Sequence, residues 1–398
     1  MNSAKIFSLA LLMIFLCVIS SGQAKDVQPL DGFYEKRISR SVSNSNNVVL
    51  FNQKHSMLCF SIGLESTNPK LVQALSDYNL ELIREANRAR EQISELAQKK
   101  YDFDPTQQFY PFYSESELYI RRADSAVVSV INSFSDYGGG AHGMHGWLGA
   151  SFDAETGKRL TISDICTNAE RLHSVLIDRL HREHENGLFN DAESTVLKLI
   201  AEEKINFVLE PRGVLFIFNP YEIAPYAAGM LTTFVLFDEV PELFKAKYQK
   251  HTAAYAQSIP MYYPTSVEIR NGTRSNLTVS RDEDRVVVEL DGRQITAHLT
   301  NIQAISYAHT ADGGNFLYIN ATAEADGFSA VEGECISIFK LNGELELVDR
   351  MPYTFRRDSE DWLMITNPNS IQFDSAMPVG DRYSHFGAIN SDGTFSFG

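Results

Sequence analysis

The sequence predicts an α+β protein in which an antiparallel sheet with packed helices is followed by a mainly β C-terminal domain, either a sandwich or an open barrel. Helix and strand patterns are interspersed before residue 255, whereas short alternating runs separated by Asn-Gly and Gly-Gly turns dominate after it. The 398 residues, 44% of them hydrophobic, suffice for about two buried cores. The second part is too short for a four-bladed propeller at about 40 residues per blade.

An apolar run near the N-terminus is typical of an export signal. Lys5 precedes the run at residues 6–20, and small residues lead to Ala24, where a signal peptidase would cut. The run is shorter than the roughly 20 residues that a membrane span needs. We therefore predict an exported protein, periplasmic or extracellular, with no transmembrane segment after cleavage. An uncleaved anchor is the alternative.

Four segments follow from these patterns. Residues 1–24 form the signal peptide, and residues 25–250 form the α+β domain. Residues 251–265, with Pro260 and Pro264, are predicted to be a linker. Residues 266–398 form the mainly β domain, for which the sequence predicts no role.

The first domain is predicted to open with a strand at residues 60–65 and a long helix. Asn68 followed by Pro69 is typical of a helix start with a side-chain cap. Apolar residues then recur at three- and four-residue steps to about residue 98, which predicts one buried helix face. These residues are Leu71, Leu75, Tyr78, Leu82, Ala86, Ala89, Ile93 and Leu96.

Alternating runs and turn residues predict the remaining elements of this domain. A helix is expected at residues 170–185, and a short one begins at Pro241. The predicted strands cover residues 118–122, 127–134, 147–153, 205–209, 214–218 and 231–237.

The charge balance is strongly acidic, with 35 Lys and Arg against 51 Asp and Glu, which gives a net charge of -16. Nucleic acid and anionic membrane surfaces are therefore poor partners, and a basic protein or a cation would be attracted. Solubility alone is the alternative reason for this charge.

Three cysteines follow the predicted signal peptide, namely Cys59, Cys166 and Cys335. They are too few and too widely spaced for a disulfide framework or a zinc knuckle. Two alternatives remain for these cysteines. Either Cys59 and Cys166 form a disulfide, or the thiols are free and buried.

Residues 137–146 hold five glycines in ten positions. Glycine allows backbone conformations that other residues avoid and lets another group approach closely. A strand follows this segment, not a helix, so it does not resemble a phosphate-binding loop. His142 and His145 lack a third ligand nearby in the sequence, so a structural turn is favoured over a metal site.

Two further motifs follow. Residues 152–164 read Phe-Asp-x-x-Thr-Gly-x-x-Leu-Thr-x-x-Asp, which predicts a strand, a tight turn with positive φ at Gly157, and a helix start. Residues 218–229 read Phe-x-Pro-Tyr-Glu-Ile-Ala-Pro-Tyr-Ala-x-Gly, ahead of the last strand of the first domain.

These two motifs, after Gly-Gly-Ala-His-Gly at residues 139–143, resemble the RsiV-like extracytoplasmic domain family (DUF3298, with a preceding DUF4163 or PdaC-type region). The resemblance covers about residues 51–247. It implies an α+β domain and, by similarity to the anti-sigma factor RsiV, a receptor-like role in binding lysozyme. It does not by itself imply catalysis.

The sequence also departs from the proteins that carry this domain. Only five residues precede the apolar run, so we expect no signalling across a membrane to a sigma factor. The His-x-x-x-His pair of the PdaC-type deacetylase module does not occur in the sequence. We therefore predict no catalytic residue, no metal and no cofactor.

Two hypotheses result. The favoured one is an exported non-enzymatic cell-envelope binding protein whose ligand is a lysozyme-like cationic protein or peptidoglycan. Aromatic rings would stack on sugars or fill a pocket of the partner, and a carboxylate would meet a basic group. The proposed contacts are His142, His145, Trp147, Tyr221, Glu222 and Tyr226.

Two alternatives to these contacts remain open. The loop that carries the two tyrosines and Glu222 is equally interpreted as a core-packing turn. A cell-wall polysaccharide hydrolase or deacetylase with an unrecognised site is the alternative function, and His142, His145 and Glu222 are its only candidate residues.

Overall fold

The structure is a computed structural model. It describes residues 26–105, 108–184, 187–270, 272–324, 331–354, 356–357, 361–375 and 384–397. The signal peptide predicted at residues 1–24 lies outside these residues, as does the last residue of the helix predicted at 170–185. Among the described residues, no helix is both long and apolar enough to cross a bilayer.

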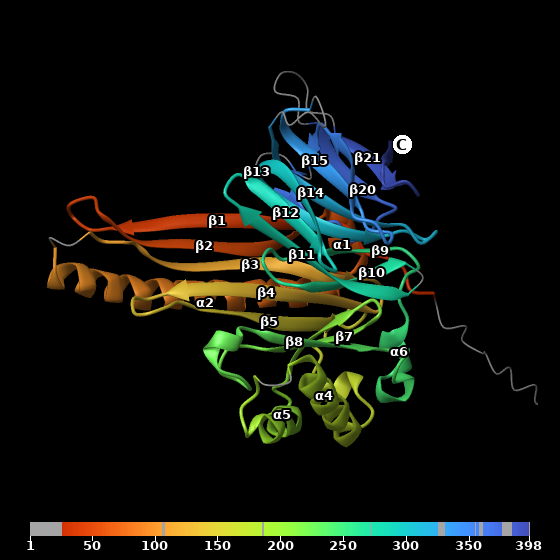
Figure 1. The fold of residues 1–398 in the computed structure, drawn as a ribbon, viewed down its shortest axis with the longest axis horizontal. Coiled ribbons are helices and arrows are strands. Elements are labelled where there is room, and N and C mark those ends of the chain that lie inside the picture. Colours follow the sequence, from red (N-terminus) through yellow and green to blue (C-terminus); the bar gives the residue numbers. More distant parts are fainter. Residues whose placement is uncertain are drawn as a thin grey trace, which may run out of the picture.

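The fold is α+β, as predicted, with about 24% helix and 45% strand. Figure 1 shows three tiers. A long sheet backed by α2 (Pro69–Phe103) forms the middle tier, and the C-terminal strands lie above it. A small sheet with α4 (Ala169–Glu183) and α5 (Ala192–Ala201) lies below.

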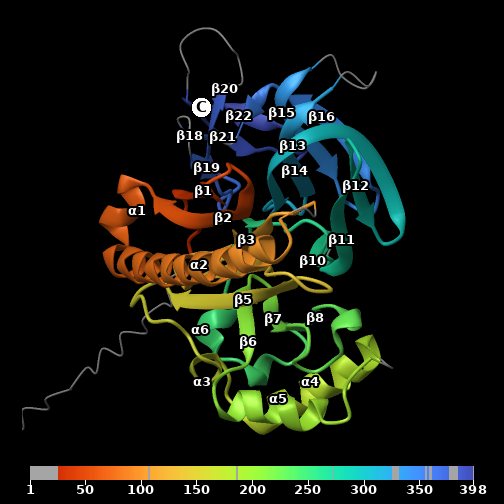
Figure 2. The same ribbon diagram turned by 90° about the vertical axis from the view of Figure 1, so that its left-hand side faces the viewer.

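The middle tier is a seven-stranded sheet. Its strands are β1 (Phe33–Ser43), β2 (Val49–Phe60), β3 (Phe112–Ala123), β4 (Val127–Tyr137), β5 (Met144–Asp153), β18 (Arg356–Arg357) and β19 (Asp361–Leu363). Their order is β18-β19-β1-β2-β3-β4-β5, with β2 and β3 parallel and the other neighbours antiparallel. A parallel pair needs a crossover connection, and α2 supplies it, packed on one face of the sheet (Figure 2).

Helix α2 has the predicted buried face over most of its length. Leu71, Leu75, Tyr78, Leu82 and Ile93 are buried. Leu96, predicted to be buried, is 49% exposed. The neighbouring residue is Gly138, which has no side chain that could cover Leu96. A Cβ added at Gly138 would lie 3.7 Å from Leu96 Cδ1.

The start of this helix differs from the prediction in two ways. Residues 60–65 are not a strand, because β2 ends at Phe60 and α1 (Ile62–Thr67) follows. The Ser61 hydroxyl accepts the Leu64 N–H at 3.1 Å, and this cap outweighs the short alternating pattern. Asn68 makes no side-chain cap for α2, because its Oδ1 accepts the Thr67 hydroxyl at 2.8 Å.

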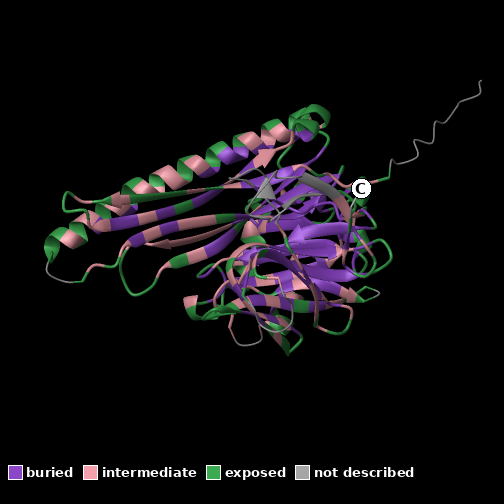
Figure 3. Ribbon diagram, turned by 90° about the horizontal axis from the view of Figure 1, so that it is seen from above, coloured by how far each residue is buried: buried purple, intermediate pink, exposed green. Residues whose placement is uncertain are grey.

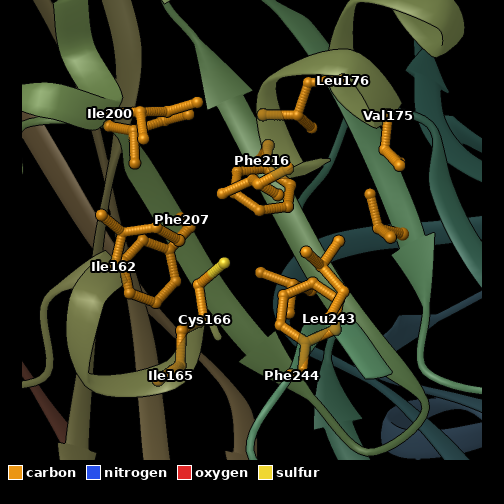
Figure 4. Close-up of a cluster of buried hydrophobic side chains, with 14 of the residues drawn as sticks. Ile162, Ile165, Cys166, Val175, Leu176, Ile200, Phe207, Phe216, Leu243 and Phe244 are labelled. Carbon is orange, nitrogen blue, oxygen red and sulfur yellow. The ribbon is translucent and has the colours of Figure 1, made fainter. Parts of the chain in front are cut away.

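The lower tier contains a three-stranded antiparallel sheet. Its strands are β6 (Asn206–Glu210), β7 (Gly213–Phe218) and β8 (Leu231–Leu236). Besides α4 and α5, this tier contains the short helices α3 (Ile162–Ile165), α6 (Ala246–Gln249), η1 (Tyr226–Ala228) and η2 (Pro241–Leu243). The hairpin and last strand of the first domain are therefore as predicted. Phe207 and Phe216 pack against Leu176 and Ile200 in the core shared with the helices (Figure 4).

The upper tier holds an eight-stranded and a four-stranded sheet, and the described strands form no closed barrel. The first has the order β10-β11-β12-β13-β14-β15-β16, with β9 paired to β13, and the second the order β17-β20-β21-β22. The strands are β9 (Tyr255–Ser258), β10 (Thr265–Arg270), β11 (Thr273–Asp282), β12 (Arg285–Leu290), β13 (Arg293–His309), β14 (Asn315–Ala323), β15 (Gly333–Lys340), β16 (Glu346–Met351), β17 (Tyr353–Thr354), β20 (Ile371–Ser375), β21 (Ser384–Ile389) and β22 (Phe395–Phe397).

The C-terminal region returns to the middle tier through β19, which pairs with β1 at Tyr34 and Leu363. Buried residues are densest where the tiers meet, and the far end of α2 and its neighbouring strands is more exposed (Figure 3). The domain boundaries at residues 250 and 265 stay a prediction.

The cysteines lie in separate parts of the fold. Cys166 and Cys335 are buried, Cys59 is half-buried, and the bridge considered between Cys59 and Cys166 is not formed. Burial raises the pKa of the Cys166 thiol, although hydrogen bonds oppose this effect. A thiol with a raised pKa is a weak nucleophile at neutral pH.

Candidate functional site

The glycine-rich segment at residues 137–146 and the motif at residues 218–229 meet at β5, the edge strand of the middle sheet. Asn219 Oδ1 accepts the Trp147 N–H at 2.8 Å, and Asn206 Oδ1 accepts the Gly149 N–H at 2.8 Å. The Trp147 carbonyl accepts both amide groups, at 2.7 Å from Asn206 and 3.0 Å from Asn219. The two asparagines thus satisfy backbone groups that an unpaired edge strand would leave exposed.

Glycine is required on β5 for this close approach. A Cβ at Gly146 would lie 2.4 Å from Asn219 Oδ1, and a Cβ at Gly149 would lie 2.3 Å from the Phe207 carbonyl oxygen. Both distances are far below van der Waals contact, so a side chain at Gly146 would displace the Asn219 side chain from the Trp147 N–H, and one at Gly149 would push the backbone of β6 away from β5.

We expect Gly149→Ala to lower the free energy of unfolding by about 1–3 kcal/mol, because its methyl group would meet backbone that cannot rotate away. Gly138→Ala is the matched control, since its Cβ would only touch Leu96 Cδ1 at 3.7 Å. Urea unfolding of both variants measures the difference. Equal stability of the two variants would contradict this account of β5.

The motif at residues 152–164 forms a turn that holds three segments of the chain together. Asp153 Oδ1 accepts the Thr156 N–H and hydroxyl, both at 3.0 Å. Its Oδ2 accepts the Lys247 ammonium at 2.5 Å and the Tyr248 hydroxyl at 3.2 Å. Gly157 has φ of +73°, as predicted, and a Cβ there would lie 2.4 Å from the Lys70 carbonyl oxygen. This motif therefore serves the fold.

Stability should depend on the ionisation of Asp153. Burial acts to raise the pKa of this carboxyl, but hydrogen bonds from Lys247 and Thr156 outweigh burial and lower it. A carboxyl with a lowered folded-state pKa stabilises the fold above its unfolded pKa of about 3.9, and this contribution is lost as pH falls through the folded-state value.

We therefore expect Asp153→Asn to be less stable than the wild type at pH 7, and the difference to shrink as the pH is lowered from about 5 towards 2. Thermal unfolding of both proteins across this range measures the effect. A difference of constant size at all pH values would show that the charge of Asp153 contributes nothing.

Four of the six predicted contact residues lie together, and we call them the aromatic cluster: His142, His145, Tyr221 and Tyr226. The rings of His142 and Tyr226 are stacked at 3.8 Å between centroids, with 21° between their planes. The Tyr226 ring lies 5.6 Å from His145 and 5.6 Å from Tyr221.

Hydrogen bonds fix the inner part of this cluster. The Tyr226 hydroxyl donates to the Gly143 carbonyl at 2.7 Å and lies 3.5 Å from His145 Nδ1. His142 Nδ1 is 2.9 Å from the same carbonyl oxygen. The glycine segment and the third motif are therefore joined at one point, 83 residues apart in the chain between Gly143 and Tyr226.

Tyr221 forms the outer part of the cluster. Its side chain is 52% exposed, and its φ of 72° lies in the left-handed region that a residue with a large side chain rarely adopts. The Tyr221 N–H donates to the Ala224 carbonyl at 3.1 Å, which holds this conformation. The structure thus presents a large ring to solvent at a backbone position that costs free energy.

The other two predicted contacts lie elsewhere. Trp147 is only 2% exposed, and its ring packs at 4.9 Å from Tyr263. Glu222 is exposed over part of its surface, and its Oε2 accepts the Asn219 N–H at 2.8 Å. Partial burial raises the pKa of Glu222, although this hydrogen bond opposes the rise.

Sequence reasoning missed Tyr263, whose ring lies between those of His145, at 6.4 Å, and Trp147. Tyr263 lies in the segment predicted to be a linker, and an aromatic residue before a proline is only a weak sequence signal for a site.

His142, His145 and Glu222 do not form a metal-binding group, and the described residues contain no group of three or more His, Cys, Asp or Glu that would hold a metal.

The match to known proteins concerns the lower tier. Residues 168–238 match the family described as "Protein of unknown function (DUF3298)", which confirms this part of the predicted resemblance. The RsiV-like and DUF4163 parts stay predictions. No curated protein matches the chain.

Two solved structures of DUF3298 family proteins are similar to the chain. One, from Bacteroides fragilis, is 16% identical, with a TM-score of 0.41, and the match covers 55% of this chain and 96% of that one. The other, from Pseudomonas aeruginosa, is 16% identical, with a TM-score of 0.33, and the match covers 57% and 97%.

Proposed function

We propose that this chain is an exported, non-enzymatic binding protein of the cell envelope, and that its aromatic cluster binds a lysozyme-like cationic protein. The observation that carries the proposal is Tyr221, an exposed ring in a left-handed backbone conformation beside the stacked rings of His142 and Tyr226. Strain of this kind persists only where the surroundings hold it, and it is concentrated in binding and active sites.

The loop that carries Tyr221 is preorganised for binding. The Glu222 N–H donates to the Asn219 carbonyl at 3.0 Å, and the Glu222 carboxylate accepts the Asn219 N–H. Ile223 and Ala224 are buried beneath the loop. A rigid loop loses little conformational entropy on association, and tyrosine is enriched among the residues that dominate binding energy.

The charge favours a cationic partner. The net charge of -16 attracts a basic protein at long range and speeds its encounter, and Glu222 adds an exposed residue with a carboxylate directly after Tyr221 in the chain. Peptidoglycan itself carries carboxylates on its peptide stems, so the same field repels it. Of the two ligands predicted from the sequence, the lysozyme-like protein therefore fits these residues better.

The export signal is consistent with this partner. The pattern of Lys5, the apolar run and Ala24 supports delivery to the periplasm or the medium, where lysozymes attack the wall. The similarity of the three motifs to RsiV supports the same ligand. Both supports come from the sequence.

The purified chain from residue 25 should be retained on immobilised c-type lysozyme and released by salt, because exposed charges are screened at high ionic strength. Succinylated lysozyme, which has the same fold with its lysine charges reversed, is the matched control and should not retain it. Sedimentation with insoluble peptidoglycan forms the second arm. Binding to peptidoglycan alone would assign the cluster to a glycan, and binding to neither would contradict the proposal.

A further inference from the structure

A cavity of about 550 Å³ lies beyond Trp147, between β8, the end of α4 and the start of β10. Strand β8 alternates across it: Thr232, Phe234 and Leu236 line the cavity, while Leu231 and Val235 belong to the core of the lower tier. The apolar wall consists of Trp147, Leu215, Met230, Phe234, Leu236 and Tyr263. Its volume is within the range of about 300–1,000 Å³ typical of small-molecule sites.

Two deeply buried polar groups line this cavity without a hydrogen-bond partner. Trp147 is 2% exposed and Thr265 is 4% exposed, and neither the indole Nε1 nor the Thr265 hydroxyl is hydrogen-bonded to the described residues. Leaving such a group unpaired costs about 1–3 kcal/mol, and native proteins rarely tolerate it. An indole nitrogen only donates, so its partner must be an acceptor.

The charged side chains of the lining are mainly cationic. Arg121, Arg179 and Arg274 line the cavity with Glu183 and Glu210; Arg121 is paired with Glu210, and Arg179 with Glu183 and with Glu239 outside the lining. Arg274 is the least tightly paired of the three, because its Nη2 lies 3.7 Å from Glu210 Oε2, so it is the group that would meet an anion.

Arg274 shows how a flat anion would be held. Its guanidinium carbon lies 4.4 Å above the centroid of the Phe234 ring, and its Nη2 donates to the Ser266 carbonyl at 2.6 Å. Its side chain is only 11% exposed. A guanidinium fixed in this way is preorganised to meet a carboxylate with little loss of entropy.

We propose that this cavity is a binding site for a small aromatic carboxylate. Phe234, Tyr263 and Trp147 contact the ring system, and the acceptor oxygens meet Arg274, the Trp147 indole N–H and the Thr265 hydroxyl. This site is separate from the lysozyme proposal, because Tyr221 and His142 do not line the cavity and each binding event is measured with its own ligand.

Calorimetric titration of the chain from residue 25 with 2-naphthoate tests the site. The same ring system as a neutral alcohol, 2-naphthylmethanol, and as a cation, 2-naphthylmethylammonium, provides matched probes. We expect saturable binding of 2-naphthoate at one site and at least about 10-fold weaker binding of the cation. Equal affinity for the three probes, or no saturable binding of 2-naphthoate, would overturn the proposal.

Two variants locate the binding. Thr265→Val removes the unpaired hydroxyl at constant size, so we expect an unchanged or raised melting temperature and roughly 3- to 10-fold weaker binding of 2-naphthoate. Thr233→Val is the control, because Thr233 is equally buried and its hydroxyl is also unpaired, but it does not line the cavity. Its affinity should match the wild type. An equal affinity of the two variants would place the ligand elsewhere and overturn the assignment.

Discussion

Replacing Glu210 with alanine is expected to lower the free energy of unfolding by about 3–5 kcal/mol, since it leaves a buried charge without its partner. Arg121 is 1% exposed and donates to Glu210 Oε1 from Nε at 3.0 Å and from Nη2 at 2.6 Å. Its Nη1 donates to the Ser258 carbonyl at 2.7 Å. This arginine on β3 therefore joins β6 of the lower tier and β9 of the upper tier.

Urea unfolding monitored by circular dichroism measures this loss. Glu95→Ala provides the exposed control, because the Glu95 carboxylate pairs with Lys99 at 2.6 Å on the solvent face of α2, where an ion pair adds little to stability. Replacing both Arg121 and Glu210 with methionine should recover part of the loss, since the Arg121 charge is then removed together with its partner, although Arg274 still loses its contact with Glu210 Oε2 at 3.7 Å. A loss as small as that of Glu95→Ala would show that the three tiers do not depend on this pair.

Tyr221→Ala is expected to weaken binding to c-type lysozyme by about 2 kcal/mol or more, roughly 30-fold in affinity. The ring is exposed, so its removal opens no cavity in the core, and alanine keeps the Cβ, so the left-handed backbone is as unfavourable as before; within the loop only the ring contact with Tyr226 is lost. The melting temperature should therefore remain near that of the wild type while binding is lost.

Tyr262→Ala is the matched control for this prediction. Tyr262 is 59% exposed and has φ of 67°, so it resembles Tyr221 in residue type, exposure and backbone conformation. Tyr221 has the Tyr226 ring at 5.6 Å, whereas Tyr262 is not part of the aromatic cluster. Lysozyme affinity should be unchanged in this variant. An equal loss in both variants would mean that any exposed tyrosine serves, and that the cluster is not the binding site.

Elements set by local chemistry were predicted well. The turn at Gly157 follows from Asp153, Thr156 and glycine within five positions, and the hairpin of β6 and β7 follows from its turn residues. The error at residues 60–65 has the same origin, because the Ser61 cap is a local signal that was read as part of an alternating run.

Contacts between segments that are distant in the chain were harder to predict from the sequence. The members of the aromatic cluster could be predicted from the aromatic and histidine residues of two motifs. The sequence contains no sign, however, that Asn219 would bind the edge of β5 and bring these two motifs together. The same edge explains Trp147. Its backbone is held on both sides by asparagine, and its ring turns into the fold towards Tyr263, so it cannot stack on a surface ligand.

The most direct test of the central claim is the affinity of the chain from residue 25 for c-type lysozyme, measured by calorimetry at about 0.05 M and 0.5 M salt. We expect one saturable site with a Kd of about 1 μM or tighter at low salt, and weaker binding at high salt because the acidic chain attracts the basic partner. No saturable binding at either salt concentration would contradict the claim that the aromatic cluster binds a lysozyme-like protein.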